Sequence, residues 1–462
     1  MSDVGQVNRI DILPDDALLR ISDFYVETDL PYVLKRETEV WQTLVHVYRR
    51  WRTLVLGSPR RLNLRLFCTP ETPARDTLDV WPALPLIVRD DKPPSGTDNV
   101  VAALGRSNRV CQVSLGRVAG RQFEEVLAAM EVPFPELTVV ELSSNGETVP
   151  VIPDSFLGGS APRLRRFYLS GIRFPGLPKL HLSATHLVHL LLTNIPHSGY
   201  ISPEAVVTLI SPLSSLKILS LRFQSPRSCP HREIRRPSPS RRSVIPALAS
   251  LYFKGVIEYL EDLVTGIDTP QLDDMRITFF NLIDFHTPRL TQFINRTPKL
   301  GKRDASVLFY DNRAHVRLSP GILEIEISCK EPDWQLSSIE QICNSSLHPL
   351  STVEDFYIVH LYDQPVRKDN AIENTLWLQL LLPFTAVKNL YLSKEFATGV
   401  AAALQELVGG RITEVLPSLQ NIFVEGLVPS GPFRKSIGQF VSARQVSDHP
   451  ITISDWDGRR GR

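Results

Sequence analysis

The segments LRRFYL (residues 164–169), LKILSL (residues 216–221) and VKNLYL (residues 387–392) share one pattern, and this pattern decides the fold. An apolar residue is followed by two variable residues, a second apolar residue, one variable residue and a third apolar residue. Between most copies lie about 17 to 28 residues, enough for a return segment that is often helical. Nine copies occur, and they begin at Leu137, Leu164, Leu187, Leu216, Leu248, Leu272, Val353, Val387 and Leu419.

Each of these units has one apolar edge that it cannot bury alone. Stacking the units side by side produces a parallel sheet with a continuous core, so the repeats predict an α/β solenoid. The pattern is similar to the strand signature of leucine-rich repeats. Because the spacing is irregular and in places exceeds the usual length of that repeat, the resemblance implies a divergent leucine-rich-repeat solenoid.

The register of the repeat separates inward from outward side chains. Leu164, Phe167 and Leu169 should face the core, so Tyr168 between them should point outward. Outward aromatic residues with arginine neighbours are typical of protein-recognition surfaces. Tyrosine also has a high strand propensity, which is the alternative explanation for its presence here. The sequence therefore predicts a client-binding row on the concave face of the sheet, formed by Tyr168, Tyr252, Tyr357, Tyr391 and Phe423.

Two segments depart from the repeat. Residues 305–328 alternate apolar and polar side chains around short turn signals, which predicts a small antiparallel meander that decorates or interrupts the solenoid. Residues 224–243 are basic, rich in serine and proline and almost without apolar side chains, which predicts a disordered loop. This loop is either a solvated connection or a phosphorylation or nuclear-import patch.

The first sixty residues contain two short amphipathic patterns in place of the repeat. ILPDDALLRISDFYV (residues 12–26) has a proline and two acidic residues where a helix would begin. WQTLVHVYRRWRTL (residues 41–54) places aromatic and aliphatic residues at three-four spacing. Two such helices bury little surface alone, so they should pack against the rest of the chain or against another protein.

These two patterns resemble an F-box, in a form similar to the large F-box families of mushroom-type fungi. The resemblance implies docking onto the Skp-type adaptor of a cullin–RING ubiquitin ligase. The link between the helices is longer than in the family, and Tyr48 and Ser22 depart from its pattern. An ordinary helical hairpin that caps the next domain is the alternative. The adaptor-binding residues that the resemblance implies are Leu13, Pro14, Leu18, Ile21, Leu44, Val47 and Trp51.

Composition and charge exclude several other classes of protein. The formal net charge of +1 gives no general attraction to nucleic acid or membrane, and no apolar run reaches membrane length. The N-terminus lacks the apolar core of a signal peptide, which favours an intracellular protein of cytoplasm or nucleus. The five cysteines are scattered without a close pair, so we expect reduced thiols and neither a disulfide framework nor a zinc site.

No nucleotide-binding, nucleophile-elbow or metalloprotease motif is present, and the sequence therefore predicts neither an enzyme nor a cofactor. His181, His186, His189 and His197 lie in one stretch, but the repeat register does not make them converge, so we expect no metal site there. No basic stripe with stacking aromatic residues indicates an RNA-binding module.

The sequence thus predicts a substrate receptor of a Skp–cullin–F-box ligase, with the adaptor on the F-box and an unknown client on the repeats. The alternative is a leucine-rich-repeat interaction scaffold with no ligase role. The predicted organisation is a tail at 1–10, an F-box-like module at 11–60, a connecting segment with the start of the repeats at 61–135, a repeat array at 136–446 and a C-terminal tail at 447–462.

Overall fold

The computed structural model divides into two compact units, Met1–Phe167 with Phe174–Ala184, and Tyr168–Arg173 with Thr185–Arg462. Each unit combines strands of a largely parallel sheet with helices. The residues that the structure describes are 13–26, 49–57, 65–80, 83–90, 97–116, 120–144, 146, 148–228, 242–280, 287–300, 304–329, 332–345, 348–361, 373–429 and 431–457.

The first unit begins with two helices, α1 (Asp15–Val26) and α3 (Arg49–Gly57), which contact each other. The backbone carbonyl of Pro14 accepts hydrogen bonds from the first turn of α1, and Asp15 and Asp16 stand at the positive end of the helix. The guanidinium of Arg50 on α3 lies 2.5 Å from the Asp15 carboxylate. Within the described residues, therefore, both predicted amphipathic segments contain a helix.

Three further strands lie in the segment that the sequence predicts as a connection with the start of the repeats. They pair in parallel in the order β1-β2-β3-β4, so the sheet begins well before residue 136. The strand β1 has only three residues, and Asp90 stands after β2 where the repeat pattern has its third apolar residue, so the pattern does not reveal these two strands. The bounds are β1 Leu66–Cys68, β2 Leu86–Arg89, β3 Val110–Leu115 and β4 Val139–Ser143, with helices α4 Ala74–Thr77, α5 Asp98–Leu104, α6 Arg121–Ala129 and α7 Leu177–His181.

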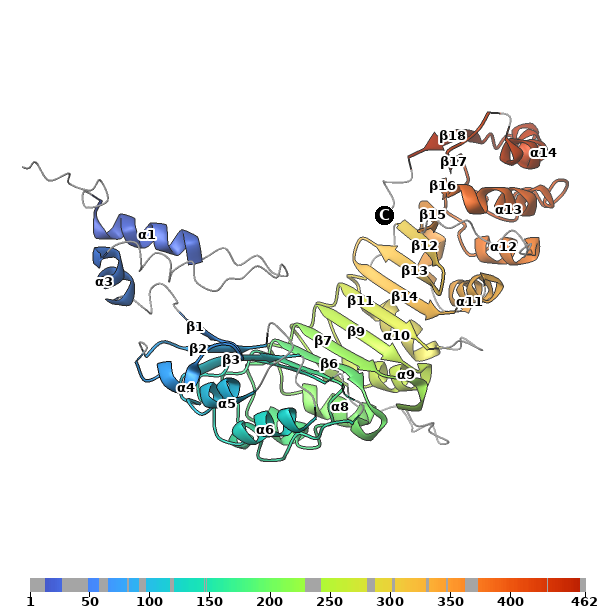
Figure 1. The fold of residues 1–462 in the computed structure, drawn as a ribbon. Coiled ribbons are helices and arrows are strands. Elements are labelled where there is room, and N and C mark those ends of the chain that lie inside the picture. Colours follow the sequence, from blue (N-terminus) through green and yellow to red (C-terminus); the bar gives the residue numbers. More distant parts are fainter. Residues whose placement is uncertain are drawn as a thin grey trace, which may run out of the picture. The chain divides into compact units, whose positions relative to one another are not determined.

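The second unit carries a long run of neighbouring strands in the order β6-β7-β9-β11-β14-β13-β12-β15-β16-β17-β18 (Figure 1). The strand β5 (Arg166–Ser170) crosses the division between the units. The strand bounds are β6 His189–Ile195, β7 Ile218–Phe223, β9 Ser250–Gly255, β11 Asp274–Phe279, β12 Asp304–Tyr310, β13 Arg313–Ser319, β14 Ile322–Ser328, β15 Asp355–His360, β16 Asn389–Leu392, β17 Asn421–Glu425 and β18 Thr452–Trp456.

All nine copies of the repeat pattern contain a strand that begins two residues after the first apolar position. Leu164, Phe167 and Leu169 are almost completely buried, as the register predicts, whereas Tyr168 is only half-buried. The inward residues pack against the helical layer. The Phe356 ring on β15 stacks on Phe384, which lies in the turn after the helix that ends at Leu381, with ring centroids 4.0 Å apart. Alternation along the strand therefore assigned the faces of the sheet correctly.

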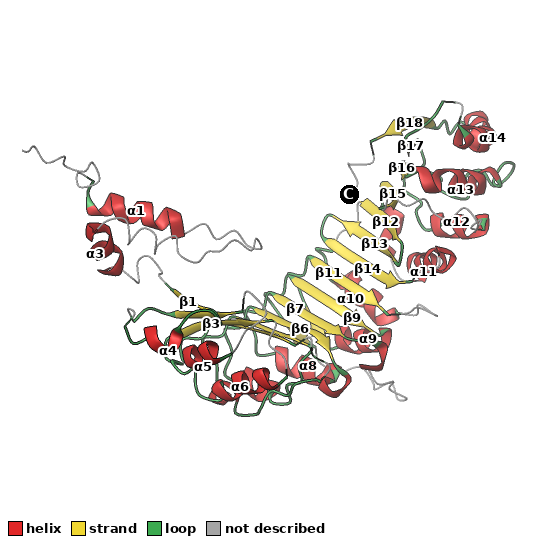
Figure 2. Cartoon of the chain, viewed as in Figure 1, coloured by secondary structure: helices red, strands yellow, loops and turns green. Residues whose placement is uncertain are grey.

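The helices of the second unit follow the strands along one side of the sheet (Figure 2). The start of α8 shows how the sequence begins one of these helices. Ser202 caps α8 by accepting a hydrogen bond from the Ala205 backbone N–H at 3.2 Å. The helix bounds are α8 Pro203–Ile210, α9 Ile257–Thr265, α10 Pro288–Arg296, α11 Pro332–Ser345, α12 Asn374–Leu381, α13 Lys394–Gln405 and α14 Pro432–Val446.

The segment predicted as a meander contains β12, β13 and β14, which pair with one another in antiparallel fashion. The outer two of these strands continue the sheet, because β14 pairs in parallel with β11 and β12 pairs in parallel with β15. Only β13 therefore runs opposite to the repeat strands, the sheet continues through the meander, and the outward residues of the meander join the same face as those of the repeats.

Two boundaries differ from the sequence prediction. The strand β18 lies inside the predicted tail at 447–462 and pairs in parallel with β17, so the sheet extends to Trp456. At the predicted loop 224–243, Pro226–Ser228 form a short 3₁₀ helix, and Ser243 begins strand β8 (Ser243–Val244), which pairs with β10 (Ile267–Asp268). Residues 229–241, the rest of that prediction, lie outside the described residues.

Over the described ranges, no helix combines the length and the apolar character needed to cross a bilayer. Cys68 and Cys343 are buried, Cys111 and Cys329 are half-buried, and these four are free thiols, while Cys229 lies outside the described residues. Burial raises the pKa of the Cys68 thiol to about 11.

Candidate functional site

The candidate site is the side of the second unit's sheet that lies opposite the helices, which we name the strand face. It consists of the outward side chains of β6, β7, β9 and β11 to β18, while β8 and β10 form a separate small sheet. The strand register places one middle position of each strand in a single row across this face, formed by Leu191, Ser220, Tyr252, Arg276, Glu324, Arg317, Ser306, Tyr357, Tyr391, Phe423 and Ser454. Four of the five predicted client-binding residues lie in this row.

Three aromatic residues at the C-terminal end of the row form what we name the aromatic ladder, Tyr357, Tyr391 and Phe423. The Tyr357 and Tyr391 rings stack with centroids 4.3 Å apart and an interplanar angle of 10°. The Tyr391 and Phe423 rings stack at 4.6 Å and the same angle. In-register parallel pairing of β15, β16 and β17 produces this stack, since it places equivalent side chains one strand spacing apart.

The aromatic ladder is partly covered from its own side of the sheet. Trp456 on β18 lies with its ring centroid 5.5 Å from Tyr391 and 6.1 Å from Tyr357. Leu308 and Val359 are buried in the same cluster. Burial raises the pKa of the Tyr357 phenol, and the neighbouring Tyr391 and Asp355 raise it further. These tyrosines therefore belong to a small apolar core as well as to the surface.

A polar row runs beside the aromatic ladder, two residues earlier on each strand. The Asn389 side-chain amide donates to the Asp355 carboxylate at 2.7 Å, and the Asn421 amide donates to the Asn389 carbonyl oxygen at 2.8 Å. Thr452 on β18 continues the row with a hydrogen bond to Asn421. Since each of these bonds links two neighbouring strands, the row fixes the register on which the stacked rings depend.

The middle of the row has a different chemistry, and we name Tyr252, Asp274, Arg276, Glu324 and Arg317 the charged section. The Tyr252 hydroxyl donates to Asp274 at 2.9 Å, and Arg276 Nε donates to the same carboxylate at 3.0 Å. The Arg276 guanidinium also lies 5.7 Å from the centre of the Tyr252 ring. Glu324 stands between Arg276 and Arg317 in register, and its carboxyl has a raised pKa because burial outweighs the two arginines.

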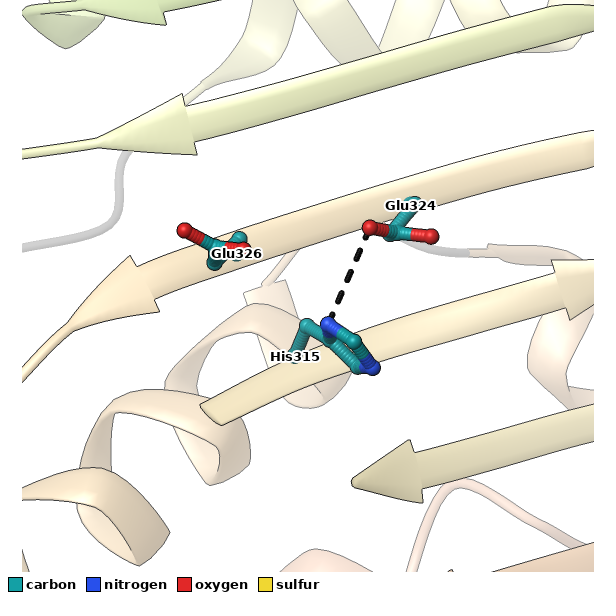
Figure 3. Close-up of side chains that lie close together, drawn as sticks. All are labelled: His315, Glu324 and Glu326. Carbon is teal, nitrogen blue, oxygen red and sulfur yellow. Dashed lines mark ion pairs between the residues drawn. The ribbon is translucent and has the colours of Figure 1, made fainter. Parts of the chain in front are cut away.

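One histidine lies beside the charged section on the meander. His315 on β13 is 6% exposed, and burial lowers its pKa to about 4, with Arg313 and Arg317 lowering it as well. Glu324 on β14 points toward it, and Glu326 lies opposite it in the register on the same face of β14 (Figure 3). These residues were not among the site residues predicted from the sequence. The alternation in ILEIEIS (residues 322–328) was the available signal, since inward Leu323, Ile325 and Ile327 require the glutamates to face outward.

The described histidine side chains of residues 181–197 do not converge on one point. His186 is exposed, His189 is half-buried on β6, and His197 Nδ1 lies 2.7 Å from the backbone oxygen of Arg227. The His181 side chain lies outside the description. Among the described residues, the group of histidine and acidic side chains that converges is His315, Glu324 and Glu326.

The predicted adaptor-binding residues are only partly described. Leu13 and Pro14 are exposed just before α1, Ile21 is half-buried, and Leu18 is completely buried. Leu18 therefore supports the helix pair from inside and offers no contact surface of its own. Leu44 and Val47 lie outside the described residues, as does the side chain of Trp51.

These elements define a mixed α/β protein with a large, mostly parallel sheet, consistent with a leucine-rich-repeat-like solenoid. No protein-family model matches the chain, and no curated protein sequence matches it. The F-box resemblance of residues 11–60 accordingly stays a prediction.

Two solved structures are similar to the chain at a low level. One is the complex of TLR13 with ssRNA13, with 13% identity, a TM-score of 0.28, and coverage of 82% of this chain and 48% of that chain. The other is the complex of Rad7 and Elc1 in yeast, with 12% identity, a TM-score of 0.24, and coverage of 89% and 88%. The chain thus spans about half the length of the first, and at these TM-scores neither comparison carries a functional conclusion.

Proposed function

We propose that the chain is a non-catalytic interaction scaffold that captures a protein client on the strand face. The observation that carries this proposal is the row of tyrosine, phenylalanine and arginine side chains that crosses the sheet from β9 to β17. Aromatic and arginine residues supply most of the binding energy in protein interfaces when they lie at the centre of a contact. The row offers such residues on a rigid support.

The charged section is the better place to test this proposal. Tyr252 is half-buried and the Arg276 side chain is 43% exposed, so truncating them removes little core packing. The aromatic ladder is less suitable, since its rings pack on buried Trp456. We therefore expect the double variant Tyr252→Ala, Arg276→Ala to fold normally and to lose client binding.

The experiment is affinity purification of the full chain from its own cells, followed by mass spectrometry. The matched control is Arg434→Ala, Lys435→Ala, which removes two exposed side chains from α14 on the helical side. A client is a protein enriched with the wild type and the control but lost with the strand-face variant. An identical set of bound proteins for all three would contradict the proposal.

We further propose that residues 11–60 join the scaffold to a Skp-type adaptor of a cullin–RING ligase. The support is the F-box resemblance and the paired helices α1 and α3, with Leu13 and Pro14 exposed at the start of α1. Leu13→Asp in the full chain should abolish co-purification with a purified adaptor, whereas Arg434→Ala, Lys435→Ala should not. If the wild type itself does not bind the adaptor, the scaffold has no ligase role through this module.

A further inference from the structure

Three potential metal ligands converge on the meander, where Glu324 of the charged section lies beside Arg276 in the register. His315 on β13 and Glu326 on β14 stand directly opposite each other, and Glu324 lies two residues earlier on the same face of β14 (Figure 3). One ligand atom from each side chain can be chosen so that all three lie within 4.8 Å of one another. His315 Nδ1 is 3.7 Å from a Glu324 carboxylate oxygen.

The state of the imidazole is a second and independent observation. His315 is more than nine-tenths buried, and neither of its ring nitrogens has a hydrogen-bond partner among the described residues. The 3.7 Å separation from Glu324 is too long for a hydrogen bond. Buried polar atoms without partners are rare in folded proteins and call for a specific explanation. A coordinated cation would use the lone pair of one nitrogen, on the side where the two glutamates lie.

We infer that His315, Glu324 and Glu326 form a binding site for a divalent transition-metal ion, with Zn²⁺ as the best match. One imidazole nitrogen and two carboxylate oxygens are ligands that zinc accepts, and three protein ligands leave a fourth position open to water or a client group. Tetrahedral zinc needs ligand atoms about 3.3 Å apart. Rotation of the two glutamate side chains can close the remaining gap, because both are flexible and only partly buried.

The nearby arginines decide which cations can compete for this site. Arg313 lies 3.6 Å from Glu326, and Arg276 and Arg317 flank Glu324. These positive charges oppose any cation that is held by charge alone. Ca²⁺ and Mg²⁺ also need about six or more oxygen ligands, so the site should reject them. Zn²⁺ gains from the imidazole nitrogen, but it must displace Arg313 from Glu326.

Because Zn²⁺ and Arg313 compete for Glu326, removing Arg313 should change the affinity for Zn²⁺. A buried histidine that binds no metal would not give this result. The Arg313 side chain is 42% exposed and lies 4.5 Å from the centre of the Tyr310 ring, outside the ligand set. Arg313→Gln should therefore tighten Zn²⁺ binding, on the order of tenfold, by releasing Glu326 from its ion pair. His315→Ala and Glu326→Gln should each weaken binding by at least about tenfold, since loss even of outer-shell partners typically costs that much.

The test is titration of the EDTA-treated full chain with ZnCl₂ by calorimetry, with CaCl₂ and MgCl₂ as comparison ions. Co²⁺ absorption spectra of the same proteins report the coordination geometry, and a spectrum that changes in His315→Ala indicates that the imidazole is a ligand. His189→Ala is the matched control, because it removes a half-buried strand-face histidine from β6 without touching the meander. We expect one Zn²⁺ per chain in the wild type and in this control.

Two results would overturn the inference. The first is Zn²⁺ binding that His315→Ala and Glu326→Gln leave unchanged, which would place the ion elsewhere. The second is no Zn²⁺ binding by either the wild type or Arg313→Gln, which would leave His315 as a buried side chain without a ligand. Circular dichroism of each variant separates a lost ligand from a lost fold. Client capture enters neither result, so the metal site and the proposed function stand or fall separately.

Discussion

The aromatic ladder and the charged section occupy equivalent positions of one row, yet they differ in what surrounds them. Tyr357 and Tyr391 stack on each other and lie against Trp456, which comes from the last strand of the sheet. Tyr252 and Arg276 share the Asp274 carboxylate. The difference teaches that facing outward from a strand does not make a side chain part of the solvent-exposed surface.

Neighbouring strands produce this contrast. A parallel partner with an aromatic residue in register turns a tyrosine into one layer of a stack, whereas the arginine partner of Tyr252 places a guanidinium beside the ring. The sequence analysis grouped Tyr252 with Tyr357 and Tyr391 as equal members of a client surface. The structure gives Tyr357 and Tyr391 an additional role in packing, so their truncation should also cost stability.

Among the variants that test the difference between the two regions, Trp456→Ala should change the free energy of unfolding most. The indole is only 7% exposed and covers the aromatic ladder, so its removal should destabilise the fold by about 3–5 kcal/mol. Chemical denaturation measures the change. Trp334, which is 63% exposed on α11, is the control and should change stability by less than about 0.5 kcal/mol. Equal losses for both tryptophans would remove the distinction between the two regions.

The free energy of unfolding should depend on pH through His315, which lies beside the charged section. The pKa of His315 is about 4 in the folded protein against an ordinary value of 6.5, so the unfolded chain takes up the proton first as the pH falls. The His315 contribution is therefore complete above pH 6.5 and is lost between pH 6.5 and about 4, by about 3 kcal/mol. Denaturation in EDTA at several pH values should show a shallower slope for His315→Gln. Parallel curves for the two proteins would rule out this contribution.

Coupling between the stacked tyrosines should be smaller but specific. A double-mutant cycle on Tyr357→Ala and Tyr391→Ala should give an interaction energy of about 0.5–1.5 kcal/mol, the range for packed aromatic pairs. The same cycle on Tyr252 and Tyr391 should give a value near zero, because several strands separate them in the sheet. Similar couplings in both cycles would mean that the row responds as a whole and not through ring contact.

The smallest effect should follow the loss of the surface ion pair in the charged section. Arg276→Ala removes a side chain that is 43% exposed, so the free energy of unfolding should change by about 0.2–1 kcal/mol. Raising the salt concentration should weaken even this contribution, since exposed charges are screened. A loss comparable to that of Trp456→Ala would show that the charged section is also a core.

The sequence by itself determined the repeated strands and their faces. The spacing in LKILSL and its eight relatives requires three apolar side chains on one side of a strand, and hydrophobic burial then fixes which side faces the helices. Alternation also predicted the meander, because apolar and polar residues follow each other in turn along residues 305–328.

Four strands of the large sheet belong neither to the nine predicted copies nor to the meander. The strand β1 has only three residues, Asp90 takes the third apolar position after β2, and the outward-facing Trp456 of β18 has no apolar partner on the same face of its strand. The strand β3 does fit the pattern, with Val110, Val113 and Leu115, but it precedes the first copy that was counted.

Only the tertiary structure decided which outward side chains are covered and which ones meet. Trp456 reaches Tyr357 across two intervening strands, and His315 meets Glu324 and Glu326 only because the meander folds β13 antiparallel to β14 in one particular register. These contacts depend on strand order and on a register that a shift of one residue would destroy. Local spacing cannot specify them, because the partners come from separate strands and their proximity is a property of the assembled sheet.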